Sequence, residues 1–123
     1  MNVNVEIKNM AQIKSAFRQA PYLMTKNLSK AIKASIFDVQ RASMKITPVK
    51  TGFLRGSHRT GMTSPLSGYV EPTASYAFFV HEGTRFMRGR PFLADALETE
   101  DGFIEAEFEK AVQDTLDSIG RKV

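Results

Sequence analysis

The chain has 123 residues, of which 42% are hydrophobic and 24% are charged, so we expect one globular domain covering residues 1–123. It contains no cysteine, which excludes disulfides and thiolate metal sites. We expect neither a signal peptide nor a membrane span, because the start lacks a basic-then-apolar pattern and no run reaches about 18 apolar residues. This composition fits a protein made in a reducing cytoplasm.

The formal net charge is +4, but its distribution along the chain is uneven. Residues 1–90 carry fourteen basic and four acidic side chains, whereas residues 91–123 carry three basic and nine acidic ones. Two interpretations remain open. The acidic segment is a solvated helix face, or the regions of opposite charge attract across a subunit boundary or line different surfaces of an assembly.

The N-terminal third is predicted to be one strand followed by two helices. Residues 3–7 alternate apolar and polar side chains, which indicates a short strand with one buried face. Apolar residues from Met10 to Phe17 recur at helical spacing, and Pro21 interrupts this helix or begins the next. From Tyr22 to Ile46 apolar residues recur at steps of three or four, which predicts an amphipathic helix of about six to seven turns.

The middle of the chain is predicted to be a turn followed by a β-hairpin. Thr47-Pro48 ends the long helix, because a residue before proline is pushed out of the helical region. Residues 49–52 are expected to form a tight exposed loop in which Gly52 supplies a positive φ. Strands near Leu54–Thr63 and Ser67–Glu71 would then be joined by residues 64–66.

The C-terminal part is predicted to be helical. A short helix at Tyr76–Glu82 is stopped by Gly83, and Arg85–Arg90 is expected to be a basic loop. Pro91 suits the first turn of the last helix, which Gly102 is expected to kink or divide in two.

The predicted class is therefore α+β, with long helices packed on a small antiparallel sheet in the order β-α-α-β-β-α-α. Two strands alone would be marginal, so the N-terminal strand or a strand from a neighbouring subunit is expected to complete the sheet.

No catalytic, cofactor-binding or metal-binding residue is predicted. His81-Glu82 begins like a zinc-protease helix, but Arg85 stands where the second histidine is needed. Ser57-His58 are neighbours whose side chains would point to opposite faces of a strand, which argues against a serine hydrolase. No GxxxxGK[ST] or GxGxxG phosphate loop is present.

The basic segment Arg85–Arg90 carries aromatic and apolar residues between its arginines, and Lys50, Arg55 and Arg59 add to the same half. Clustered Lys and Arg can bind a phosphate backbone without reading bases. Alternatively, these arginines pair with acidic residues of the C-terminal helix, in the same or a neighbouring chain, and this second interpretation is preferred.

The aromatic residues divide into two predicted groups. Tyr76, Phe79 and Phe92 are expected in the core. Phe53, Phe78 and Phe86 lie beside turns and are expected to be exposed or to contact a neighbour.

Three segments resemble, in order, the signature of the tail-completion or head–tail joining (neck) minor tail proteins of tailed bacteriophages. TPVKTGFLRGS at 47–57 is similar to (A/T)PVDTGxLRxS, YAFFVHEGT at 76–84 to YAxxVExGT, and RPFLADAL at 90–97 to QPFLxPAL. Lys50 stands where aspartate is usual, His81-Glu82 shifts the acidic position, and Asp95 replaces a proline.

The resemblance implies a structural virion protein, without cofactor or turnover, that is made in the bacterial host cytoplasm. It would form a homo-oligomeric ring, often a hexamer, between the capsid connector and the tail tube. Its partners would be other neck and tail proteins (connector or stopper, terminator, tail tube) and, through non-specific contacts, the duplex DNA that passes. No membrane is involved.

Residues beside the motif turns are then the predicted interface: Lys50, Thr51, Phe53, Leu54, Arg55, Phe78, Arg85, Phe86, Arg88 and Arg90. The predicted structural turns lie at Pro48, Gly52, Gly83 and Pro91. Two alternatives remain: a tail terminator that caps the tail tube, and a small basic module that binds nucleic acid without sequence specificity.

Overall fold

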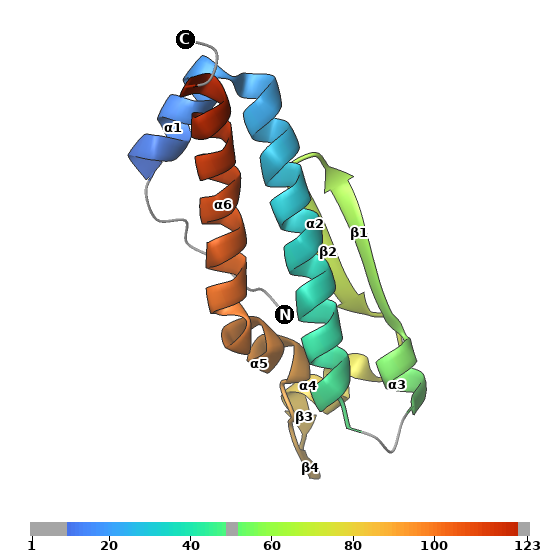
Figure 1. Cartoon of the computed structure of the whole chain (residues 1–123). Coiled ribbons are helices and arrows are strands. Elements are labelled where there is room, and N and C mark those ends of the chain that lie inside the picture. Colours follow the sequence, from blue (N-terminus) through green and yellow to red (C-terminus); the bar gives the residue numbers. More distant parts are fainter. Residues whose placement is uncertain (1–9, 49–51, 121–123) are drawn as a thin grey trace.

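The structure, a computed structural model, describes residues 10–48 and 52–120 and consists mainly of helices (Figure 1). Its elements are α1 (Met10–Gln19), α2 (Pro21–Ile46), α3 (Gly52–Gly56), β1 (His58–Ser64), β2 (Ser67–Pro72), α4 (Ala77–Glu82), β3 (Gly83–Thr84), β4 (Met87–Arg88), α5 (Phe92–Thr99) and α6 (Asp101–Gly120). Helices with a small antiparallel sheet agree with the predicted α+β class. The predicted order lacked α3 and the β3–β4 pair, and the expected strand at residues 3–7 lies outside the described residues.

The long helix α2 is the central element of the fold. Pro21 occupies its first turn, where the missing N–H costs no hydrogen bond. The helix ends at Ile46, and its C-cap Thr47 has an extended ψ of 134°, as expected for a residue before proline. Both predicted ends are therefore confirmed. In Figure 1, α6 runs along one side of α2 and the β1–β2 hairpin lies on another.

The hairpin pairs β1 with β2 in antiparallel register, so that His58 lies opposite Pro72 and Thr60 opposite Val70. The predicted hairpin is confirmed, but Ser64 belongs to β1 and pairs with Ser67, so the connection consists of residues 65–66 and not 64–66. The predicted first strand was too long, because Leu54–Gly56 belongs to α3. Ser57 ends that helix by donating both its N–H and its hydroxyl to the carbonyl of Leu54. Within residues 10–48 and 52–120, β1 and β2 have no third strand beside them.

The C-terminal helix is divided in two, as Gly102 suggested. Pro91 precedes α5 as its N-cap instead of lying in its first turn. Helix α5 ends at Thr99 with Glu100 as its C-cap, and α6 begins at Asp101. The pair α5–α6 packs antiparallel to α2 along its length.

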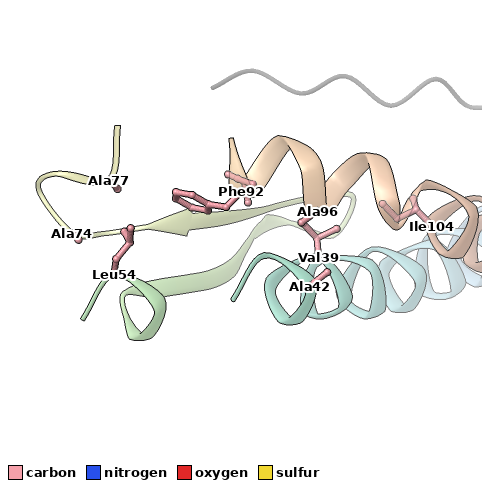
Figure 2. Packing of buried hydrophobic residues seen from close by; sticks show 9 residues of the cluster. Val39, Ala42, Leu54, Ala74, Ala77, Phe92, Ala96 and Ile104 are labelled. Carbon is pink, nitrogen blue, oxygen red and sulfur yellow. The ribbon is translucent and has the colours of Figure 1, made fainter. Parts of the chain in front are cut away.

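Buried apolar side chains form two clusters on opposite ends of α2. The first lies between the C-terminal half of α2, α3, α4 with the segment before it, α5 and the start of α6, as Figure 2 shows. The second lies between α1, the N-terminal half of α2, and α6. Phe108 of α6 packs against both clusters and therefore connects them.

Candidate interaction surface

The three sequence segments that carry the resemblance come together at one end of the molecule. Leu54 from the first segment is fully buried in one cluster with Ala77 from the second and Phe92 from the third (Figure 2). Backbone hydrogen bonds reinforce the contact, because the N–H of Arg90 donates to the carbonyl of Val80 at 2.9 Å. Residues more than thirty positions apart thus form one packed unit.

Leu54 was predicted to lie at an interface, and this prediction is wrong. Its side chain has no exposed surface. The short helix α3 turns Phe53 outward and Leu54 inward, since successive helical residues point about 100° apart. Leu54 therefore anchors α3 to the core, and Phe53, which is 72% exposed, is the residue that this helix offers to a partner.

The basic segment that follows α4 is a small hairpin and not a loop. Gly83 pairs with Arg88 across β3 and β4, and Thr84 pairs with Met87. Gly83 has a φ of 87°, and a Cβ added there would lie 2.5 Å from the N atom of Gly89. Glycine at both positions therefore lets the two chain segments approach closely at the open end of the hairpin, and the positive φ of Gly83 ends α4 as predicted.

Large apolar side chains are exposed around this hairpin. Phe78 and Phe79 of α4 are 56% and 54% exposed and contact each other edge to face, with ring centroids 5.8 Å apart. Phe79 was predicted to be core, and that prediction is wrong. Helix α4 buries Ala77 and His81, one turn apart, so the intervening Phe78 and Phe79 face outward.

Phe86 at the turn between β3 and β4 is 89% exposed, and the Arg85 guanidinium lies 5.5 Å from its ring centroid. Arg85, Arg88 and Arg90 are exposed and form no ion pair with any acidic residue in the described ranges. Pairing of these arginines with the C-terminal helix of the same chain is therefore not found there.

The tip surface, as we define it, consists of Phe53, Phe78, Phe79, Arg85, Phe86, Met87, Arg88 and Arg90. Figure 1 shows its elements α3, α4, β3 and β4 together at the lower end of the molecule. Phe53 joins it through the ring of half-buried Tyr76, whose centroid lies 6.4 Å away. The predicted exposure of Phe53, Phe78 and Phe86 is thus confirmed, whereas Tyr76 is only partly in the core.

The remaining predicted residues have mixed outcomes. Lys50 and Thr51 lie outside the described residues. Arg55 is half-buried, and its Nε atom is buried without a hydrogen-bond partner. Pro48 is half-buried behind the end of α2. Gly52 was expected in a loop but is the first residue of α3, where an added Cβ would meet nothing within 4 Å.

Beneath the tip surface, a buried histidine connects α2 to β1. The Nδ1 of His58 lies 2.9 Å from the carbonyl oxygen of Arg55, which can only accept, so Nδ1 carries the proton. The Nε2 then accepts from the Ser43 hydroxyl at 2.8 Å. Burial lowers the pKa of His58, which favours this neutral form.

A serine hydroxyl that donates to an imidazole is the beginning of a nucleophilic site, but this pair cannot serve as one. Ser43 has no exposed surface and His58 is 3% exposed, so no substrate can reach the hydroxyl. This pair was not predicted from the sequence. The only signal was that Ser43 lies on the apolar face of α2, where a buried hydroxyl needs a distant partner.

The second histidine, His81, packs against Phe92, the same core aromatic residue that His58 contacts. The Phe92 ring contacts both imidazoles edge to face, with centroid distances of 5.7 Å to His58 and 5.2 Å to His81. His81 Nδ1 lies 2.8 Å from a carboxylate oxygen of Glu82, and its Nε2 faces the N–H of Ala94 at 3.4 Å. Both imidazoles are thus held by contacts inside the protein.

In the part of the chain that the structure describes, no three His, Cys, Asp or Glu side chains gather where they could hold a metal ion. Over the same residues, every helix is too short or too polar to cross a membrane. Comparison of the chain with protein-family profiles, curated proteins and solved structures found no match.

Proposed function

We propose that the chain is a structural virion protein of a tailed phage, a tail-completion or neck subunit that forms a ring at the head–tail junction through which DNA passes. The observation that carries the proposal is the tip surface. Four of its residues (Phe53, Phe78, Phe79 and Arg90) belong to the three segments that resemble the tail-completion family, and residues 85–88 connect the second segment to the third. Its exterior is an aromatic and arginine surface instead of a catalytic cleft.

The composition of the tip surface supports a docking role. Exposed aromatic residues next to arginine are enriched at the centres of protein interfaces, where they supply most of the binding energy. Monomeric soluble proteins rarely expose several large apolar side chains together. Phe53 lies on α3, which the buried Leu54 anchors, and Phe86 lies on the two-residue turn of the paired strands β3 and β4. The backbone that carries each ring is therefore ordered before a partner binds, which lowers the entropy cost of binding.

The buried side of the same end supports a structural role over a catalytic one. Its titratable groups, His58 and His81, are both about 95% buried or more and are engaged with Ser43, backbone carbonyl, Glu82 and Phe92. Both side chains stabilise the packing behind the tip surface, and neither is accessible to a substrate in solvent.

The proposal is tested in a phage whose genome encodes this chain. The double substitution Arg85→Glu/Arg88→Glu reverses charge on the tip surface without touching the core. We expect filled heads and normal tails that fail to join, and a large loss of infectious particles, in electron micrographs and titres of the lysate. The matched control is Lys14→Glu/Arg18→Glu, which makes the same charge change on the exposed face of α1.

Three other outcomes decide against the proposal. Equal titres for the tip variant and the control would show that head–tail joining does not depend on the tip surface. Tails of uncontrolled length would favour the tail terminator. Absence of the chain from purified particles, together with tight salt-dependent binding of duplex DNA by the free monomer, would favour the nucleic-acid-binding module.

A further inference from the structure

Helix α2 presents a basic stripe on the side that faces solvent. Lys26, Lys30 and Lys33 follow one another at steps of four and three, which places them on one face of the helix, and all three are exposed. Tyr22, one turn before Lys26, is 91% exposed. The only acidic residue of α2 is Asp38, which is buried, so nothing on this helix neutralises the stripe.

Helix α6 presents a stripe of the opposite sign. Glu107, Asp114 and Asp117 follow one another at steps of seven and three, with Lys110 the one basic residue among them. Asp114 and Asp117 are exposed, and Glu107 is half-buried. Phe103, one turn before Glu107, is 40% exposed. Each stripe therefore pairs an exposed aromatic at its N-terminal end with several like charges.

The two stripes do not meet within the chain. Helix α6 contacts α2 through Asn27, whose amide donates to Thr115 at 2.9 Å, and through the buried alanines behind it. The lysines instead lie beside Pro65 at the tip of the β1–β2 hairpin, on another side of α2. Within residues 10–48 and 52–120, none of the charged residues of the stripes forms an ion pair.

We infer that the basic stripe of α2 in one copy docks on the acidic stripe of α6 in the next copy, so that the subunits join head to tail. The inference rests on the proposed ring function and names the faces that would make the ring. Complementary charge specifies the partner, because a two-fold symmetric contact of either stripe with itself would bring like charges together. A contact between two different faces repeats around a ring, as a neck subunit requires.

The aromatic residues give each stripe an apolar anchor. Tyr22 would pack beside the acidic helix, and Phe103 beside the lysines, where an aromatic face also attracts ammonium groups. The tip surface is left free by this arrangement, so that it remains available for the adjoining ring of the neck.

Self-association of the purified full chain tests the inference, measured by sedimentation equilibrium at low and high salt. We expect the wild-type protein to associate more strongly at low salt, because screening weakens exposed charge pairs. Lys26→Glu/Lys33→Glu and, separately, Asp114→Lys/Asp117→Lys should each weaken association by about tenfold or more. An equimolar mixture of the two variants should associate again, since each retains the face that the other lost.

The Lys14→Glu/Arg18→Glu protein is the control for net charge and should associate like the wild type. Equal circular dichroism spectra show that the variants are folded. A wild-type chain that stays monomeric at low salt, variants that associate normally, or a mixture that does not recover would each overturn the inference. So would loss of duplex DNA binding in Lys26→Glu/Lys33→Glu with unchanged association, which would make the stripe a phosphate-binding surface.

Failure here and failure of the proposed function are separate results. The sedimentation experiment concerns only the α2 and α6 stripes, whereas the function is tested by head–tail joining with tip-surface variants. If the tip-surface variants prevent head–tail joining but the stripe variants associate like the wild type, only the inferred contact between the α2 and α6 stripes is refuted.

Discussion

The Nε2 atom of His58 lies 2.8 Å from the Oγ atom of Ser43, so that a buried hydrogen bond connects the first residue of β1 to the last turns of α2. Gln40 adds a second connection by donating to the carbonyl of His58 at 3.2 Å. These bonds hold the hairpin against the long helix and support the core on which the tip surface is built.

Ser43→Ala should therefore destabilise the protein by about 1–3 kcal/mol, because it leaves a buried imidazole nitrogen without its donor. Urea denaturation at neutral pH measures the change. Ser35→Ala is the matched control, since the Ser35 hydroxyl bonds only to the carbonyl of Ala31 in its own helix. Equal losses for the two variants would show that the bond to His58 contributes nothing specific.

The same histidine predicts a dependence of stability on pH. Desolvation lowers the pKa of His58 below its ordinary value of 6.5, so the unfolded chain takes up this proton at higher pH than the folded chain does. Stability from this residue is present above pH 6.5 and is lost as the pH falls toward the folded pKa. Unfolding free energies measured between neutral and mildly acidic pH should fall less in His58→Gln than in the wild type. Parallel pH profiles would refute this role.

The packing behind the tip surface predicts a contrast between two phenylalanines. Phe92 is 1% exposed and touches both histidine rings, so Phe92→Ala should cost about 3–5 kcal/mol. Phe79 is more than half exposed, and Phe79→Ala should cost less than about 1 kcal/mol. Thermal or urea unfolding checks both values, and comparable losses would mean that Phe79 is buried after all.

The sequence predicted those parts of the fold that depend on long, regular patterns. Helix α2 was predicted with both ends because its apolar spacing continues over many turns and a Thr-Pro pair terminates it. Helix α3 was missed because five residues, glycine at each end, are too few to show a helical period. The predicted first strand therefore began at Leu54, whereas β1 begins at His58.

The side chains of the candidate surface were harder to predict than the elements that carry them. Whether Phe79 faces inward depends on which side of α4 meets the core, and this is decided by Ala77 and His81 packing on other segments. The Ser43–His58 contact joins residues from separate elements, which no local pattern specifies. The sequence shows that the N-terminal two-thirds is basic and the C-terminal third is acidic. Which charged residues line one face of α2 or α6 depends on how each helix is oriented in the fold.

Two glycines of the C-terminal half should respond to alanine in opposite directions. Gly83 has a positive φ, and an added Cβ would meet the backbone of Gly89 at 2.5 Å, so Gly83→Ala should cost more than about 1 kcal/mol. Gly102 lies in the first turn of α6, and a Cβ added there would meet nothing within 4 Å. Gly102→Ala should therefore stabilise the protein by up to about 1 kcal/mol. Unfolding midpoints of the two variants test the contrast, and a Gly83→Ala protein as stable as the wild type would contradict the close approach of Gly83 to Gly89.

A carboxylate pair at the junction of α2 with α6 predicts that one substitution stabilises the protein at neutral pH. Oδ1 of Asp38 accepts from Arg41 at 2.7 Å, but its buried Oδ2 has no hydrogen-bond partner. A hydrogen bond from a protonated Glu100 to Asp38, followed by desolvation and the charge of Asp38, raises the pKa of Glu100. Protonated Glu100 would supply the donor that Oδ2 lacks.

Because the folded pKa of Glu100 is raised, the stabilisation from this pair is present below the ordinary pKa of 4.5 and is lost as the pH rises through the folded value. Glu100→Gln provides an uncharged donor at every pH. Its unfolding midpoint should therefore exceed that of the wild type at pH 7, and the difference should shrink in acid. Glu98→Gln removes a neighbouring exposed charge and should not reproduce the gain. An equal effect of the two variants, or a gain that grows in acid, would place the origin in net charge and not in the Asp38–Glu100 contact.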